Sequence, residues 1–197
     1  LQLSQAEKSE NGAIEAGLLN CEQCGSTYPI VRFIPRFVPS ENYARNFGFE
    51  WMKHSRTQYD SYWGTNLSEK RFFEETRWPR QLTGECILEV GSGSGRFTEH
   101  AVSTGALVVS LDYSDAVEAN YQSNGKNENL LIIQADLYQM PLRENSFDKL
   151  FCMGVLQHTP DVKKSFFTLP QYLKNNGDLV VDGYPKHAWY KQFLKTK

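Results

Sequence analysis

Short, nearly continuous apolar runs recur along the chain from residue 84 onward. Runs of this length and composition are typical of strands that are buried on both faces of a parallel sheet. We therefore predict a strand at each of them. The five runs are CILEV (86–90), ALVVSLD (106–112), LLIIQAD (130–136), KLFCMGV (149–155) and DLVVDGY (178–184).

The segments between these runs carry helix start and stop signals. Helices are predicted over 94–104, over 115–123 after Ser114 as N-cap, and from about residue 160 to 177 after Thr159 as N-cap, with Pro170 bending or ending the last one. Strands that alternate with helices predict an α/β fold with a doubly wound, mostly parallel Rossmann-like sheet and helices on both faces.

The first 80 residues have a different character. Residues 1–20 are polar without sustained periodicity and are interpreted as a mobile or loosely packed tail, followed by a cysteine knuckle that reaches residue 39. Residues 40–80 are rich in aromatic side chains and predict two helices, at about 41–54 and 69–78. The predicted organisation is a tail and knuckle (1–39), a helical cover or lid (40–80) and a ligand-binding domain (81–197).

Aromatic side chains at helical spacing usually belong to a core, and we expect this of most aromatic residues in the cover. Tyr43, Phe47 and Arg56 are the candidates for contacts with a cofactor or substrate.

Composition narrows the class of protein. Among 197 residues, 40% are hydrophobic, and 21 Lys and Arg against 23 Asp and Glu give a net charge of −2. A strongly basic surface is excluded, which argues against a nucleic-acid partner. No apolar run approaches the roughly 20 residues that a membrane-spanning helix needs. Four scattered cysteines do not make a secreted disulfide framework, so a cytoplasmic location is expected.

A glycine-rich loop follows the first predicted strand of the domain. The segment Glu89-Val90-Gly91-Ser92-Gly93-Ser94-Gly95 lets a ligand approach the backbone closely, although a tight turn without a ligand is the alternative. Asp112 ends the next strand, 21 residues after Gly91. A carboxylate at this place can accept both hydroxyls of an adenosine ribose, or it is only a solvated strand end.

The spacing of the loop distinguishes between nucleotides. A dinucleotide fingerprint requires Gly or Ala where this chain has Arg96, and Glu89 before the loop would repel a pyrophosphate. A carboxylate there suits a cationic ligand. This chemistry points to S-adenosylmethionine, whose amino group and sulfonium are both positive.

Several motifs in order resemble the class I S-adenosylmethionine-dependent methyltransferases, in the subgroup that acts mostly on small molecules. The resemblance covers about residues 80–185. It rests on ILEVGSGSGRF, VVSLDYS, IIQADLYQMPLRENSFDKLF, GVLQHTPD and LKNNGDLVV.

The resemblance implies a cofactor site at the ends of the strands. Glycines of the loop would pack on the methionine moiety, Asp112 would hold the ribose, and Asp136 with Leu137 the adenine edge, although Asp136 could simply cap a turn. Glu89 would act near the amino group through water or backbone. The residues assigned to S-adenosylmethionine in this way are Glu89, Gly91, Gly93, Gly95, Asp112, Tyr113, Asp136, Leu137, Met153 and Gly154.

His158 follows the fourth strand, where substrate would meet cofactor. As a neutral imidazole it is the candidate catalytic base for a substrate hydroxyl or amine. The alternative is that His158 and Thr159 only shape the entry to the next helix. Asp161 is interpreted as a first-turn charge that favours the helix dipole.

The segment from Cys21 to Trp51 resembles the small zinc-ribbon-like or Trm112-like piece that precedes the domain in some relatives. Only Cys21 and Cys24 are present, which is half of a tetrahedral metal site, and His54 has no partner at ligand spacing. No metal is therefore assigned.

The full class I fold ends in an antiparallel hairpin after the fifth strand. Only thirteen residues follow Tyr184, so we expect these strands to be missing. Either the chain is a truncated product, or another chain, such as a second copy in a homodimer, covers the open sheet edge. A small-molecule substrate is expected. A non-catalytic S-adenosylmethionine-fold module and an NAD-dependent oxidoreductase are the alternatives.

Overall fold

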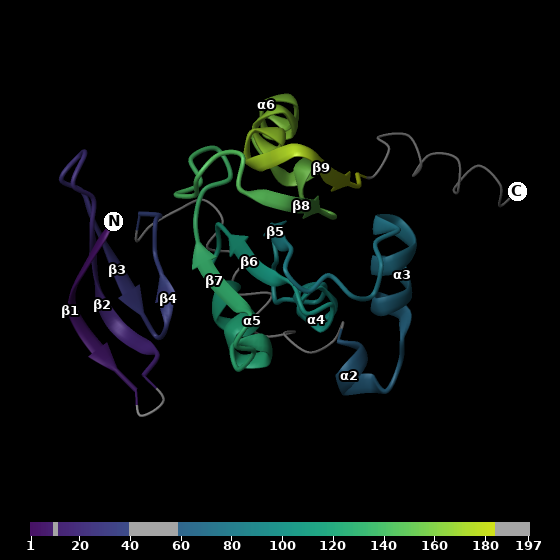
Figure 1. Ribbon diagram of the computed structural model, residues 1–197, viewed down its shortest axis with the longest axis horizontal. Helices are drawn as coiled ribbons and strands as arrows, with labels where there is room; N and C mark the ends of the chain where they lie inside the picture. The colour runs from purple at the N-terminus through teal and green to yellow at the C-terminus, as the bar shows by residue number, and fades with distance from the viewer. Residues whose placement is uncertain (10–11, 40–58, 184–197) are drawn as a thin grey trace, which may run out of the picture.

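The computed structural model describes residues 1–9, 12–39 and 59–183. Two sheets dominate this part of the chain, a four-stranded antiparallel sheet and a five-stranded parallel sheet (Figure 1). None of the described helices is long and apolar enough to cross a bilayer. The predicted helix at 41–54, with Tyr43, Phe47 and His54, lies outside the described residues, and so does Arg56.

The parallel sheet has the strand order β7-β6-β5-β8-β9, which confirms the predicted Rossmann-like α/β fold. β5 lies in its centre, and every pairing within it is parallel. Helices α4 and α5 lie on one side of this sheet and α6 on the other (Figure 1). The strands are β5 (Cys86–Val90), β6 (Leu107–Asp112), β7 (Leu130–Gln134), β8 (Phe147–Cys152) and β9 (Leu173–Val181).

The helices start and stop somewhat differently from the prediction. α6 begins after Asp161 and not after Thr159, because the Asp161 carboxylate accepts the N–H of Lys164 at 2.9 Å and thereby caps the helix. A 3-10 turn that contains Pro170 ends it, as predicted. The described helices are α2 (Asp60–Trp63), α3 (Leu67–Thr76), α4 (Thr98–Ser103), α5 (Val117–Asn124), α6 (Val162–Thr168), η1 (Leu156–His158) and η2 (Leu169–Tyr172).

The interpretation of residues 1–20 as a loosely packed tail is wrong. They form two strands of the antiparallel sheet. Most side chains of β1 are exposed, and a register shift between Ser4 and Glu7 interrupts the alternation, so the sequence shows no strand period. The strands are β1 (Gln2–Lys8), β2 (Ile14–Asn20), β3 (Thr27–Val31) and β4 (Ile34–Pro35).

The antiparallel sheet is attached to the β7 side of the parallel sheet. The N–H of Phe37 donates to the carbonyl of Gln134 at 2.8 Å, and Arg36 pairs with the carboxylate of Glu118 on α5. Ile34 is fully buried and packs against α5 and β7. The two sheets therefore share backbone hydrogen bonds, a part-buried ion pair and apolar contact.

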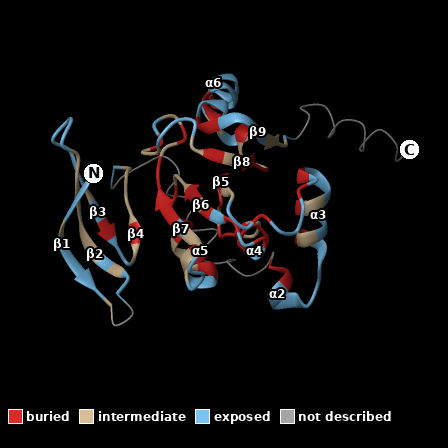
Figure 2. Ribbon diagram, viewed as in Figure 1, coloured by how far each residue is buried: buried red, intermediate tan, exposed pale blue. Residues whose placement is uncertain are grey.

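The core lies on both faces of the parallel sheet, as the burial colours show (Figure 2). On the helix α3 side, Phe72 is fully buried and meets Phe151 of β8 edge to face, with centroids 5.3 Å apart. Trp78 joins the same cluster. These aromatic residues of the cover belong to the core, as expected, whereas Tyr62 and Trp63 on α2 are exposed.

Candidate functional site at the strand ends

The glycine loop leaves the centre of the sheet after β5 and returns into α4. Gly91 and Gly95 have φ angles of +81° and +94°, which side chains rarely adopt. A Cβ on Gly95 would lie 2.1 Å from Oδ1 of Asn120. Glycine is thus required here by conformation and by close packing.

Hydrogen bonds hold this loop against β6. The N–H groups of Gly91 and Ser92 both donate to the carbonyl of Leu111, at 2.8 and 3.0 Å. The hydroxyl of Ser94 is buried and has no hydrogen-bond partner among the described residues. The loop is therefore held against β6 by its backbone, and the Ser94 hydroxyl can still form a hydrogen bond with a ligand.

Asp112 ends β6 beside the glycine loop. Its Oδ2 accepts the N–H of Gly93 at 2.8 Å, and its Oδ1 accepts the N–H and the hydroxyl of Ser114 at 2.8 and 2.7 Å. The side chain is half-buried. Three hydrogen bonds orient the carboxylate and leave acceptor capacity for a ligand, since a carboxylate has about four lone-pair sites.

Glu89 lies one layer deeper, beneath the loop. Its Oε2 accepts hydrogen bonds from the hydroxyls of Thr98 and Ser110, the latter at 2.7 Å. Burial raises the pKa of Glu89 to about 7, and the nearby charge of Asp112 adds to this effect. Two carboxylates at the start of the loop favour a cationic ligand and oppose a pyrophosphate.

The predicted adenine and ribose contacts lie at the ends of the neighbouring strands. Asp136 follows β7, and its Oδ1 accepts the N–H of Tyr138 at 2.9 Å, so it does cap a turn. Tyr113 follows β6, and its pKa is raised by burial and then by the charge of Asp136. Leu137 is buried beside them.

The exit of β8 supplies the remaining predicted residues. Met153 is buried, and Gly154 has a φ angle of +74°. His158 is exposed in η1, and its backbone N–H donates to the carbonyl of Val155 at 2.9 Å. The catalytic role of His158 stays a prediction, as do the cofactor roles of the other residues.

Sequence reasoning missed Asp182, which directly follows β9. Its carboxylate accepts the N–H of Gly154 and pairs with Arg71 of α3. It ends a parallel strand just as Asp112 does, and this position was the available signal. Asp182 fixes the loop after β8 and ties it to α3.

Tyr59 was also missed. It is buried, and its hydroxyl donates to the carbonyl of Ser94, while Nδ2 of Asn124 donates to the same hydroxyl at 3.0 Å. Burial raises its pKa, with the charges of Glu89 and Glu99 adding to the shift. No local sequence pattern indicates this contact, because the partners are 35 and 65 residues away.

The cysteine pair lies far from the strand ends, on the connection between β2 and β3. The Cys24 thiol donates to the hydroxyl of Ser26 at 3.2 Å, and hydrogen bonds with Ser26 lower its pKa. Within residues 1–9, 12–39 and 59–183, no group of three or more His, Cys, Asp or Glu is arranged to hold a metal ion.

Residues 88–181 match a family model described as a methyltransferase domain. This segment is similar to the class I S-adenosylmethionine-dependent methyltransferases. The chain is also 29% identical over 138 residues to the sterol 24-C-methyltransferase of Pneumocystis carinii. That alignment covers 60% of this chain and 37% of the relative, so the chain spans little more than a third of that methyltransferase's length.

Solved methyltransferase structures share the fold. The structure of the Haloferax volcanii Trm112 methyltransferase activator in complex with a methyltransferase matches with a TM-score of 0.59 and 18% identity, over 76% of this chain and 66% of that chain. Haemonchus contortus phosphoethanolamine N-methyltransferase 2, in complex with phosphomonomethylethanolamine and S-adenosylhomocysteine, matches with a TM-score of 0.57 and 22% identity. This second match covers 82% of this chain and 41% of that one.

Proposed function

We propose that this protein transfers a methyl group from S-adenosylmethionine to a small-molecule acceptor. The observation that carries the proposal is the Asp112 carboxylate, which the Gly93 N–H orients at the end of β6 beside the glycine loop. The match of residues 88–181 to the methyltransferase domain model supports it. S-adenosylmethionine supplies a methyl group that is already activated by a positively charged sulfur.

The residues at the strand ends fit this cofactor. Asp112 retains acceptor capacity for ribose hydroxyls, and Tyr113 with Asp136 and Leu137 lies beside it for the adenine. Gly91, Gly93 and Gly95 would carry the methionine moiety, with Met153 and Gly154 as the floor. Asp112 contributes negative charge beside the loop, and Glu89, whose pKa burial raises to about 7, adds to it in its ionised form; both favour the ligand's positive charges.

The main task of this chain in the reaction is alignment. Because the methyl group leaves an activated sulfur, most of the rate acceleration can come from holding the acceptor atom in line with it. A base is needed only where the acceptor arrives with a proton on the reacting atom. His158 is exposed at the exit of β8 and is the proposed base, through its imidazole.

The NAD-dependent alternative has weaker support. Arg96 occupies the position where a dinucleotide loop needs Gly or Ala, and its Nε donates to the hydroxyl of Ser68 on α3 at 2.7 Å. The long side chain of Arg96 therefore connects the loop to α3. A dinucleotide site instead needs a small residue at this position, so that the helix can pack closely on the strand.

Calorimetric titration tests the cofactor. S-adenosylhomocysteine should bind with a micromolar dissociation constant and NADH should not, and Asp112→Ala should abolish this binding. Glu128→Ala, which removes an exposed carboxylate elsewhere, is the matched control. Preferential binding of NADH, or no binding of either ligand, would contradict the proposal.

Turnover tests the enzyme. Incubation with S-adenosylmethionine and a panel of small oxygen, nitrogen and carbon acceptors should yield S-adenosylhomocysteine. Binding without turnover on every acceptor class would favour the non-catalytic module. Methylation that continues unchanged in His158→Ala would remove the assignment of the base but not that of the cofactor.

A further inference from the structure

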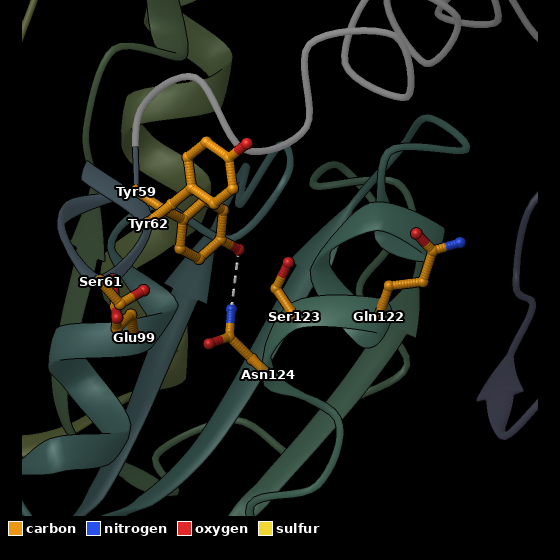
Figure 3. A pocket seen from close by; sticks show the side chains of 7 residues that line it. All are labelled: Tyr59, Ser61, Tyr62, Glu99, Gln122, Ser123 and Asn124. Carbon is orange, nitrogen blue, oxygen red and sulfur yellow. Dashed lines mark hydrogen bonds between the residues drawn. The ribbon is translucent and has the colours of Figure 1, made fainter. Parts of the chain in front are cut away.

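A hollow of about 260 Å³ lies between α2, α4 and α5. Its described lining comes from these three helices and from the residue that precedes α2. Figure 3 shows the side chains around it. They are Tyr59, Ser61, Tyr62, Glu99, Gln122, Ser123 and Asn124.

The charge of this lining is negative. Glu99 is the one charged side chain among the described lining residues, and neither Lys nor Arg is among them. Its Oε2 atom is buried and has no hydrogen-bond partner within the described part of the chain. A buried carboxylate oxygen without a donor is costly, so a ligand that brings a donor or a positive charge would be stabilised there.

Two aromatic rings lie on the same side of the hollow in Figure 3. The hydroxyl of Tyr59 is already engaged with the Ser94 carbonyl and with Nδ2 of Asn124, so Tyr59 offers a ligand its ring and not its hydroxyl. Tyr62 is 57% exposed beside it. Aromatic faces next to a carboxylate attract organic cations through the ring quadrupole.

We propose that this hollow binds a small organic ammonium ion. The Glu99 carboxylate pairs with the positive charge of the ligand and accepts hydrogen bonds from any N–H groups that it carries. The rings of Tyr59 and Tyr62 contact the alkyl substituents of the ligand. The hydroxyl and amide groups of Ser61, Gln122 and Ser123 provide the polar rim. Anions are excluded by Glu99, and neutral molecules lack the charge that this lining complements.

A nuclear magnetic resonance titration of the full chain without cofactor tests this site. The probes are tetramethylammonium chloride and butylammonium chloride, with 3,3-dimethylbutan-1-ol as a neutral analogue and sodium chloride as the ionic-strength control. We expect saturable shifts of the backbone amides at Ser61, Gln122 and Ser123 with both ammonium probes only. Equal binding of the neutral alcohol, or no shift at these amides, would overturn the proposal.

Variants sharpen the test. Glu99→Gln keeps the shape and should weaken ammonium binding about five- to tenfold, as expected for loss of a partly buried charge partner. Glu128→Gln should leave it unchanged. Tyr62→Leu alters an exposed side chain without affecting the core and should weaken tetramethylammonium more than butylammonium. Unchanged affinity in both Glu99→Gln and Tyr62→Leu would refute the site even if the amides shift.

Discussion

The N–H of Gly93 donates a 2.8 Å hydrogen bond to Oδ2 of Asp112, so the glycine loop itself orients the carboxylate at the end of β6. This contact separates two roles of Asp112, support of the loop and recognition of a ligand. Asn at this position keeps an oxygen that can accept from Gly93 but loses the negative charge, and its Nδ2 cannot accept the two hydrogen bonds from Ser114.

Asp112→Asn should therefore preserve the fold and weaken binding of S-adenosylhomocysteine by about 10- to 100-fold, since ribose hydroxyls lose a charged acceptor. Calorimetry gives the affinity and thermal unfolding gives the stability. Asp112→Ala should lower both. If Asp112→Asn binds as tightly as the parent protein, the carboxylate only supports the loop.

Gly95→Ala should destabilise the domain more than Gly84→Ala. Both positions have positive φ angles, +94° and +91°, but a Cβ meets Asn120 at 2.1 Å in the first case and nothing within 4 Å in the second. We expect a loss of about 1 kcal/mol for Gly84→Ala from backbone strain, and at least about 3 kcal/mol for Gly95→Ala from strain and overpacking.

Urea unfolding of both glycine variants measures this difference. Because both glycines have a positive φ angle and a Cβ on Gly84 meets no atom within 4 Å, Gly84→Ala measures the cost of backbone strain without overpacking. Equal losses in the two variants would mean that Asn120 moves aside without cost, and the close packing of the loop would then be unimportant for stability.

Glu89 should make the protein less stable as the pH rises. Its pKa is raised by burial to about 7 in the folded chain, from 4.5, so the folded state holds a proton that the unfolded state has lost. The stabilisation is complete below about pH 4.5 and is lost as the pH rises through 7, with a total on the order of 3 kcal/mol.

The measurement is the free energy of unfolding at pH 5.5 and pH 8 for the parent protein and for Glu89→Gln. Gln still accepts from Thr98 and Ser110 but does not titrate, so its pH dependence over this interval should be smaller. Glu128→Gln should behave like the parent protein. An identical pH profile for Glu89→Gln would show that Glu89 does not titrate in this range.

Arg36 should anchor the antiparallel sheet more strongly than Arg32, although both pair with Glu118. The side chain of Arg36 is 11% exposed and that of Arg32 is 70% exposed. Arg36 also donates to Oε1 of Gln134 at 2.9 Å. Arg36→Ala should cost about 2 kcal/mol, whereas Arg32→Ala should cost at most about 0.5 kcal/mol.

Hydrogen exchange at Phe37, whose N–H bonds to β7, reports on this anchor directly. Exchange should become faster in Arg36→Ala and stay unchanged in Arg32→Ala. Equal protection in the two variants would mean that Ile34 and the backbone hydrogen bonds hold the sheets together without the ion pair.

The parallel sheet could be predicted from local sequence patterns. β5 coincides with its predicted bounds, and β6 differs by one residue at its start, because a strand buried on both faces must be apolar throughout, which is a local signal. The position of Asp112 beside the glycine loop followed from the same reasoning, since parallel strands end at one edge. β9 starts earlier than predicted, at Leu173, because Leu173 pairs with Phe147 of β8 ahead of a register shift, whereas the apolar run that the sequence shows begins only near Asp178.

The contacts of the first 39 residues and of Tyr59 could not be predicted, because they depend on tertiary packing. Arg36 reaches Glu118 across 82 residues, and Tyr59 reaches Asn124 across 65. A hydrogen bond between side chains so far apart leaves no period in the sequence. Such a hydrogen bond forms only when whole helices and strands pack together. The burial that raises the pKa of Glu89 and the hollow lined by Glu99 depend on the same packing.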